Sequence, residues 1–342
     1  MTKGRDDYID GIRGIAITAV VLIHVASVGL GERKLYDWNL QFTLLTQQLL
    51  LFAVPTFFFL AGLFAGRSQR FRTDPFGETI ARLRRILVPY LIWSTLVFVF
   101  LGDHSQFVKF GVDLLFGRVV SPYYFIAALA CLTLITPTLL RFSRRPWLVP
   151  AAVAIGLLHL LGAYLARWHN PSLNWWFVMA PPTGWLPFYC YGIARSAELN
   201  SSAPSDYGVR FAAFAICALA LQIVEAETLT WSIGVNGGGL GPIKLSSYLY
   251  AWAVIELMMA YRGRAAFPSW LVMLGLYSFG IFLIHQPIRW GLMRLIPETS
   301  WVFDVQPLYQ IALTVSTIAI CVALISLSRY LLRDRSSRIL GL

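Results

Sequence analysis

Long apolar stretches alternate with short polar segments along nearly the whole chain. Ten of them are close to the length of about 20 residues that an α-helix needs to cross a hydrocarbon core of about 30 Å. They are residues 12–31, 42–66, 86–102, 122–140, 147–166, 176–194, 209–225, 244–261, 270–288 and 307–330. These stretches are continuously apolar and lack the period-two alternation of transmembrane strands. The pattern therefore predicts an all-α fold, a polytopic membrane bundle of about ten transmembrane helices.

Basic residues gather in every second segment between the predicted spans. The arginines at 67–85, 141–145, 195, 262–264 and 329–338 all fall on one side if the first span starts in the cytoplasm. The positive-inside rule then places the N- and C-termini in the cytoplasm. Because no segment between spans is long enough for a second fold, we expect one transmembrane domain over residues 1–342, multi-pass in the inner (plasma) membrane.

The overall composition supports this picture and excludes two other classes. Apolar residues make up 57% of the 342 residues and charged residues only 13%, too few to cover a water-soluble globule of this length. The net charge is +11, but the lysines and arginines cluster between apolar stretches and not in a basic run with interleaved aromatics, so nucleic-acid binding is not indicated. No CxxC pair and no histidine at a metal-binding offset is present, and we expect no metal.

Ionisable residues inside the first predicted span are the strongest chemical signal. The span opens with Asp10-Gly-Ile-Arg13 and carries His24 deep in its apolar run. Eleven helical steps of about 100° bring Arg13 and His24 to within about 20° of one face, about 16 Å apart along the axis. A cation near the membrane boundary could bind an anionic donor while the imidazole does proton chemistry. Alternatively, Arg13 reaches the lipid headgroups beside Asp10, and His24 hydrogen-bonds a neighbouring helix.

Several motifs resemble the membrane-bound acyltransferase-3 family. Arg13 followed by His24 is similar to the family's opening Arg-x10-His signature, and the run from Pro55 to Gly62 resembles its aromatic run ending in Ser-Gly. The basic segment 82–89 and the block 274–285, which ends in a histidine, resemble later family motifs. Ala61 stands where many members carry Ser, so no hydroxyl chemistry is assigned there.

The resemblance implies an integral membrane O-acyltransferase that moves an acyl group, most often acetyl, from cytoplasmic acyl-CoA to a hydroxyl of a cell-surface or exported carbohydrate. His24 is the expected general base, because a sugar hydroxyl is too weakly acidic to attack a thioester unaided. An acyl-histidine intermediate at the same residue stays open. Arg13, Arg82 and Arg85 are the expected ligands of the polyanionic coenzyme, although any cytoplasmic segment attracts arginine.

A second set of polar residues is expected to contact the acceptor. Ser278 and His285 lie seven residues apart on one face of the ninth predicted span, close to its outer end, and could position the substrate. Glu256 is costly in the middle of a span and must be protonated, paired or lining a cavity. With Asp10 these form the candidate substrate-binding group, while Glu225 and Glu227 at the outer boundary could also contact a sugar.

Three other functions fit the same sequence. The acceptor could be a lipid or a glycosylated small metabolite, or the protein could be a non-catalytic glycan exporter or flippase, since fold does not fix function. A purely structural membrane partner would leave the Arg13 and His24 stripe unexplained. The base distinguishes catalysis from transport, because a transporter has no need of a proton acceptor near a thioester.

Overall fold

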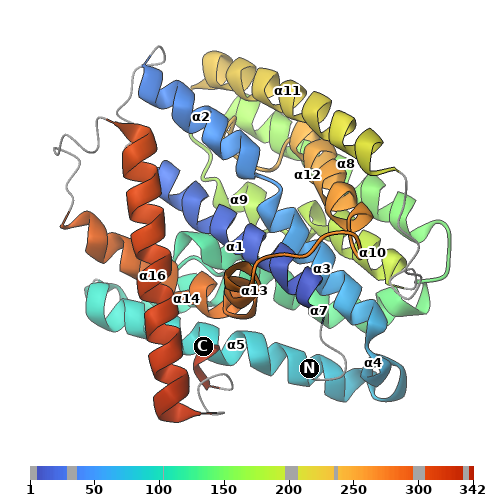
Figure 1. The fold of residues 1–342 in the computed structure, drawn as a ribbon, viewed down its shortest axis with the longest axis horizontal. Coiled ribbons are helices and arrows are strands. Elements are labelled where there is room, and N and C mark those ends of the chain that lie inside the picture. Colours follow the sequence, from blue (N-terminus) through green and yellow to red (C-terminus); the bar gives the residue numbers. More distant parts are fainter. Residues whose placement is uncertain are drawn as a thin grey trace. The chain divides into compact units, whose positions relative to one another are not determined.

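The computed structural model describes residues 6–28, 37–102, 104–196, 207–234, 238–295, 305–333 and 339–342. Among these residues the secondary structure is helical, and the β structure is limited to an isolated bridge between Arg262 and Ala265 (Figure 1). Residues 29–31 of the first predicted span and 334–338 of the basic tail lie outside the described ranges.

Within these described ranges, seven helical segments are long and apolar enough to cross a membrane, or eight if a bent pair counts as one span. Five of the seven are single helices: α1 (Asp7–Ala26), α5 (Pro75–Leu101), α8 (Leu148–His169), α11 (Gly208–Ile233) and α16 (Gln306–Leu332). The segment Trp38–Arg67 comprises α2 (Trp38–Leu50) and α3 (Ala53–Arg67). The segment Ser121–Arg141 ends with α7 (Tyr124–Arg141). The prediction of an all-α, multi-pass membrane fold is confirmed.

The remaining three expected spans differ from continuous membrane helices. Residues 176–194 form α9 (Trp176–Met179), a 3-10 turn (Pro182–Gly184) and α10 (Leu186–Arg195), because prolines at 181, 182 and 187 interrupt the helix. Residues 270–288 are divided into α13 (Ser269–Leu276) and α14 (Ser278–Met293), bent by 79°. The eighth expected span is α12 (Leu245–Ala260), a shorter apolar helix.

Helix α5 also starts earlier than the hydropathy pattern indicates. Asp74 caps it by accepting a hydrogen bond of 2.9 Å from the amide of Gly77, and Pro75 supplies a first-turn residue with a preset φ. Arg82 and Arg85 therefore lie on the helix itself and not in the segment before it.

The chain divides into two compact units. In the first, α1 packs against α13, α14 and α2, and α11 packs against α12 and α2. In the second, α5 packs against α4 (Gln69–Thr73), α6 (Phe107–Leu115) and α7, and α7 also contacts α10. Helices α3, α8 and α16 contribute residues to both units.

Glycines allow α1 and α13 to approach closely inside the first unit. A Cβ atom at Gly14 would collide with the carbonyl oxygen of Leu271, and a Cβ atom at Gly275 would collide with that of Asp10. Gly14, next to Arg13, and Gly275 on α13 therefore have a packing role, because they bring the start of α1 against the helix pair that carries Ser278 and His285.

Candidate functional site

Two histidines from distant parts of the sequence meet in the first unit. The imidazole rings of His24 on α1 and His285 on α14 have centroids 5.4 Å apart, with their planes inclined by 36°. His285 is fully buried, whereas His24 keeps part of its surface accessible. Of the two histidines, His24 is therefore the one with accessible surface.

The hydrogen bonds of His285 define its neutral tautomer. Its Nδ1 lies 2.7 Å from the carbonyl oxygen of Phe282 and 3.1 Å from that of Ile281. Carbonyl oxygens only accept, so Nδ1 carries the proton and Nε2 bears a lone pair. This Nε2 atom is buried and has no hydrogen-bond partner among the described residues. The Nε2 atom of His285 is therefore a proton acceptor that faces the protein interior.

Arg13 connects α1 to the first turn of α14. Its guanidinium forms a 3.0 Å ion pair with Asp10 and donates a 2.9 Å hydrogen bond to the Ser278 hydroxyl. Asp10 is mostly buried, and Arg13 is partly exposed. A guanidinium held by a carboxylate on its own helix and a hydroxyl on another has a fixed orientation, as bidentate anion binding requires.

A second arginine joins the other end of α1 to α14. Arg289 donates a 3.1 Å hydrogen bond to the backbone carbonyl oxygen of His24 and a 2.6 Å hydrogen bond to the side-chain oxygen of Gln286. The carbonyls of the last helical turn lack partners within the helix and carry partial negative charge, so a cation is favourable there. Arg13 and Arg289 thus hold the segment that contains His24 at both ends.

The start of α1 is fixed in the same way. Asp6 caps the helix by accepting hydrogen bonds from the amides of Tyr8 and Ile9, and it also forms a 2.7 Å ion pair with Arg262. An N-cap that is itself held by a cation limits fraying of the first turn. The first turn of α1, which precedes Arg13, is therefore anchored.

Polar residues continue beyond His24 between α1, α2 and α16. Gln47 donates a 2.9 Å hydrogen bond to the Ser27 hydroxyl, and Gln310 donates a 3.1 Å hydrogen bond to that of Thr43. Further along α16, Thr314 and Thr317 are buried, and their hydroxyls have no partner within the described ranges. Buried hydroxyls without protein partners indicate contact with water or a ligand.

The structure brings together residues to which the sequence analysis gave different roles, and it corrects one expected position. His24, His285, Arg13, Asp10 and Ser278 are brought together, but the interpretation that both Ser278 and His285 lie near the outer end of their span is wrong. Ser278 contacts Arg13 near the start of α1, because α14 begins at Ser278 after the 79° bend.

The other predicted residues lie elsewhere. Arg82 belongs to the second unit, where it pairs with Glu78 at 2.8 Å and stacks over the Phe71 ring at 4.7 Å, and Arg85 is exposed on the same helix. Glu256 is buried on α12. The roles assigned to these residues stay predictions. Within the described residues no group of three or more His, Cys, Asp or Glu is placed to hold a metal ion.

Arg289 and Gln286 were missed by the sequence interpretation. The predicted span ended at residue 288, one residue before Arg289, yet α14 continues to Met293. Its position four residues after His285, on the same helix face, was a usable signal, because an ionisable side chain inside a span is a functional candidate.

The apolar helices, with a histidine pair between two oriented arginines, define this chain as a multi-pass membrane protein. The chain belongs to the acyltransferase-3 family, since the family model described as an acyltransferase domain matches residues 6–326. Comparisons with curated proteins and with solved structures gave no match. The protein is therefore a membrane acyltransferase.

Proposed function

We propose that this protein transfers an acyl group, most often acetyl, from cytoplasmic acyl-CoA to a hydroxyl of a cell-surface or exported carbohydrate at the inner membrane. The observation that carries the proposal is the accessible imidazole of His24 beside the buried, tautomer-fixed imidazole of His285. An acyltransferase that uses a hydroxyl acceptor needs a positioned base, and this pair supplies one.

The proposed reaction at His24 needs no reactant besides the acyl-CoA donor and the hydroxyl acceptor. His24 accepts the proton of the acceptor hydroxyl as its oxygen bonds to the thioester carbonyl carbon. The carbon–sulfur bond then breaks, and the protonated imidazole returns its proton to the leaving thiolate, which gives an ester and free coenzyme A. An acyl-histidine intermediate would use the same residue as a nucleophile in two steps.

His285 acts in this proposal as a positioning residue. A ring-centroid separation of 5.4 Å leaves room for one N–H···N hydrogen bond between the imidazoles. If His24 donates its N–H to Nε2 of His285, the other nitrogen of His24 keeps its lone pair for the acceptor. A histidine base oriented by a hydrogen bond on its second nitrogen is a recurrent catalytic arrangement.

Arg13 binds the anionic donor in this scheme, with Asp10 and Ser278 fixing its guanidinium. Arg82 and Arg85 are proposed as further coenzyme ligands on α5, and Glu256 as a lining residue of the acceptor path. Bidentate contacts from arginine suit phosphate groups better than the point charge of lysine.

The test is acetyl transfer from radiolabelled acetyl-CoA to total cell-envelope glycan. Membranes containing the wild-type protein are compared with membranes containing His24→Ala, whose folding is checked by its elution as a single species after detergent extraction. Incorporation by the wild type that disappears in His24→Ala would support both the activity and the base.

Two other results would redirect the proposal. Label that enters the lipid fraction or a small glycoside, and not the glycan, would keep the enzyme and change the acceptor. No incorporation by folded wild type with several acyl-CoA donors would contradict acyl transfer to these acceptors and favour the transport alternative.

A further inference from the structure

Arg289 is a charged side chain beside the histidine pair that takes no part in the acyl transfer proposed above. It follows His285 by four residues on α14, so the two side chains lie on one face of that helix. Arg289 is half-buried, and Tyr309 on α16 lies close enough to interact electrostatically with its guanidinium. The hydrogen bond to the backbone carbonyl of His24 brings the same guanidinium to α1. A cation therefore lies next to the proposed base.

No carboxylate pairs with Arg289 within the described residues. Arg13, at the other end of α1, differs in this respect, because Asp10 lies 3.0 Å from its guanidinium. The acceptors around Arg289 are neutral: the side-chain oxygen of Gln286 at 2.6 Å, the carbonyl oxygen of His24 at 3.1 Å and the sulfur of Met293 at 3.5 Å. A half-buried cation without a counter-charge is costly inside a membrane protein, so an anion that approaches it is strongly stabilised.

One nitrogen of the guanidinium remains available for such an anion. Nε donates to Gln286, and Nη1 donates to His24 and Met293. Nη2 donates no hydrogen bond within the described ranges, and it is not among the side-chain atoms that are enclosed without a partner. Part of Nη2 is therefore accessible, and its two N–H groups can donate to a group that enters the site.

A single free nitrogen favours a single anionic oxygen. A carboxylate or phosphate is bound most strongly by two parallel N–H groups from neighbouring nitrogens of one arginine. Both pairs of nitrogens that include Nη2 contain an atom that already donates within the protein, either Nε or Nη1. The geometry of Arg289 thus suits one developing negative charge better than a permanent two-oxygen anion.

The acyl donor brings such an oxygen to this place. Arg13 is the proposed ligand of the coenzyme phosphates, and His24 lies eleven residues further, or about 16 Å along the axis of α1. The pantetheine arm separates the phosphates from the thioester, so the thioester lies toward His24 when Arg13 holds the phosphates. Its carbonyl oxygen is neutral in the bound donor and becomes negative when the acceptor oxygen attacks.

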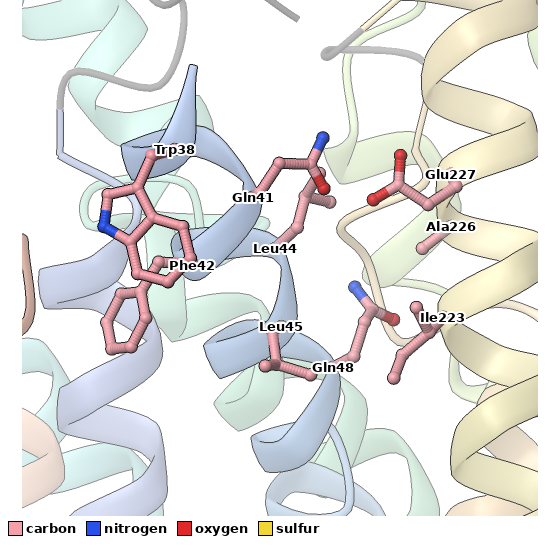
Figure 2. A pocket seen from close by; sticks show the side chains of 9 residues that line it. All are labelled: Trp38, Gln41, Phe42, Leu44, Leu45, Gln48, Ile223, Ala226 and Glu227. Atoms are coloured by element: carbon pink, nitrogen blue, oxygen red, sulfur yellow. The ribbon is translucent and has the colours of Figure 1, made fainter. Parts of the chain in front are cut away.

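A pocket elsewhere in the same unit has the opposite electrostatic character. It opens between α2 and α11, and Figure 2 shows Gln41, Gln48 and Glu227 among the side chains that line it. Glu227 is the ionisable member of this lining, so a negative charge that formed there would be repelled. The reacting thioester is therefore expected at the histidine pair and not in this pocket.

We propose that Nη2 of Arg289 donates a hydrogen bond to the thioester carbonyl oxygen and stabilises the oxyanion formed during acyl transfer. The acceptor oxygen bonds to the carbonyl carbon, its proton passes to His24, and the π electrons of the carbonyl move to its oxygen. The carbonyl then re-forms as the carbon–sulfur bond breaks, and His24 returns the proton to the thiolate. Arg289 keeps all its protons. As part of acyl transfer, this role rests on the proposed function.

Gln286 and the carbonyl of His24 orient Arg289 before the reaction begins. Gln286 is 3% exposed, and its side-chain oxygen fixes Nε, while the end of α1 fixes Nη1. Donors that are already oriented toward a developing charge need no reorganisation in the transition state, which is why such sites contribute strongly to catalysis. Gln286 is therefore a positioning residue for Arg289.

Two coenzyme A thioethers test this role without turnover. S-acetonyl-CoA carries a neutral carbonyl, and S-carboxymethyl-CoA carries an anionic oxygen in place of the methyl group at the same distance from sulfur. Isothermal titration calorimetry of the full chain in nanodiscs gives the Kd of each, and their ratio measures the preference for the anion. The variants are Arg289→Gln, Arg289→Lys and Gln286→Ala. The matched control is Arg294→Gln, which removes an exposed arginine at the end of the same helix.

We expect the wild type to bind the carboxymethyl compound at least about tenfold more tightly, and Arg289→Gln to lose this preference. Arg289→Lys keeps the charge and should retain part of it, Gln286→Ala should reduce it roughly two- to fivefold, and Arg294→Gln should leave it unchanged. In acetyl transfer, Arg289→Gln should lower kcat by roughly 10²–10³-fold, the usual effect of losing one oxyanion donor, and change the KM for acetyl-CoA by less than about threefold.

Thermal unfolding separates this role from a purely structural one. If Arg289 only caps α1, Arg289→Gln lowers the Tm while the ratio of the two Kd values stays at the wild-type value, and the proposal is wrong. A wild-type kcat in folded Arg289→Gln, or an equal loss of the ratio in Arg294→Gln, would also overturn it. If Arg289→Gln does not fold, a wild-type ratio in both Arg289→Lys and Gln286→Ala has the same meaning.

The outcome is distinguishable from failure of the proposed function. A preference for the anion that disappears in Arg289→Gln, without acetyl transfer by the wild type to any glycan, would leave the oxyanion site and remove the carbohydrate acceptor. Acetyl transfer with a ratio that Arg289→Gln does not change would leave the enzyme and remove the oxyanion site. A folded wild type that binds neither thioether would remove the coenzyme A donor and the oxyanion site together.

Discussion

His24 and His285 lie with their ring centroids 5.4 Å apart, and only His24 is accessible. Their unequal exposure gives the two residues unequal expected roles, although both carry the same imidazole ring. In the proposed function, the accessible ring meets the substrate, and the buried ring, whose Nδ1 donates to the Phe282 carbonyl, offers its lone pair to orient the first.

Substitution at the two histidines should therefore have different effects. We expect His24→Ala to lower kcat by roughly 10²–10⁴-fold, the usual contribution of a general base. His285→Ala should lower kcat about 10–100-fold, as expected for a residue that orients a catalytic imidazole, and His285→Gln should recover part of the loss because its amide oxygen still accepts a hydrogen bond. Steady-state kinetics with acetyl-CoA and envelope glycan measures both. Equal activity of His285→Gln and His285→Ala would contradict the positioning role.

Arg13 should affect the donor more than the chemistry. Loss of a charge-assisted phosphate contact of about 1.5–3 kcal/mol corresponds to a roughly 10–100-fold higher KM for acetyl-CoA in Arg13→Ala. Ser278→Ala should give a smaller rise, since it only loosens the guanidinium. The control is Arg145→Ala, an exposed arginine between α7 and α8. A KM for acetyl-CoA that stays at the wild-type value in Arg13→Ala, with kcat reduced, would place Arg13 in the chemical step.

The sequence predicted the elements of this site better than their arrangement. Hydropathy and helical periodicity suffice to place Arg13 and His24 on one face of the first span. They contain no information about the bend at Tyr277, which moves Ser278 next to Arg13, because short apolar helices and one long helix have the same hydropathy. Arg289 was missed for a related reason: a charged residue next to a predicted boundary is indistinguishable in hydropathy from the boundary itself, and its contact with the His24 carbonyl is visible only in the folded chain.

The close approach of α1 and α13 gives a stability prediction with an internal control. Gly→Ala within a helix normally stabilises by roughly 0.5–1 kcal/mol, because glycine loses more conformational freedom on folding. At Gly162 on α8 a Cβ atom meets nothing within 4 Å, so Gly162→Ala should leave the Tm unchanged or raise it. At Gly14 the new methyl group would collide with the Leu271 carbonyl, so Gly14→Ala should lower the Tm by several degrees. Thermal unfolding in detergent compares them, and similar shifts in both variants would mean that the contact at Gly14 is not tight.

The hydroxyls of Thr314 and Thr317 lead to a prediction about what fills the space around them. Both residues are buried on α16, and their hydroxyls have no partner within the described part of the chain. In a membrane protein such groups are stabilised by water or by a hydroxylated substrate, so we expect this face of α16 to be hydrated. Val315, the next residue after Thr314, is 61% exposed and should face lipid.

Cysteine accessibility distinguishes a hydrated face from a dry one on the same helix. Cys131, Cys190, Cys217 and Cys321 are first replaced by Ala or Ser, and Thr314→Cys, Thr317→Cys and Val315→Cys are then treated with a charged methanethiosulfonate reagent. A thiol reacts as the thiolate, which forms in water and not in lipid. We therefore expect modification of the two threonine positions at least tenfold faster than of Val315→Cys. Slow modification at all three positions would show that the threonines are satisfied inside a dry interior, and the acceptor would then have to reach His24 by a route that does not pass along α16.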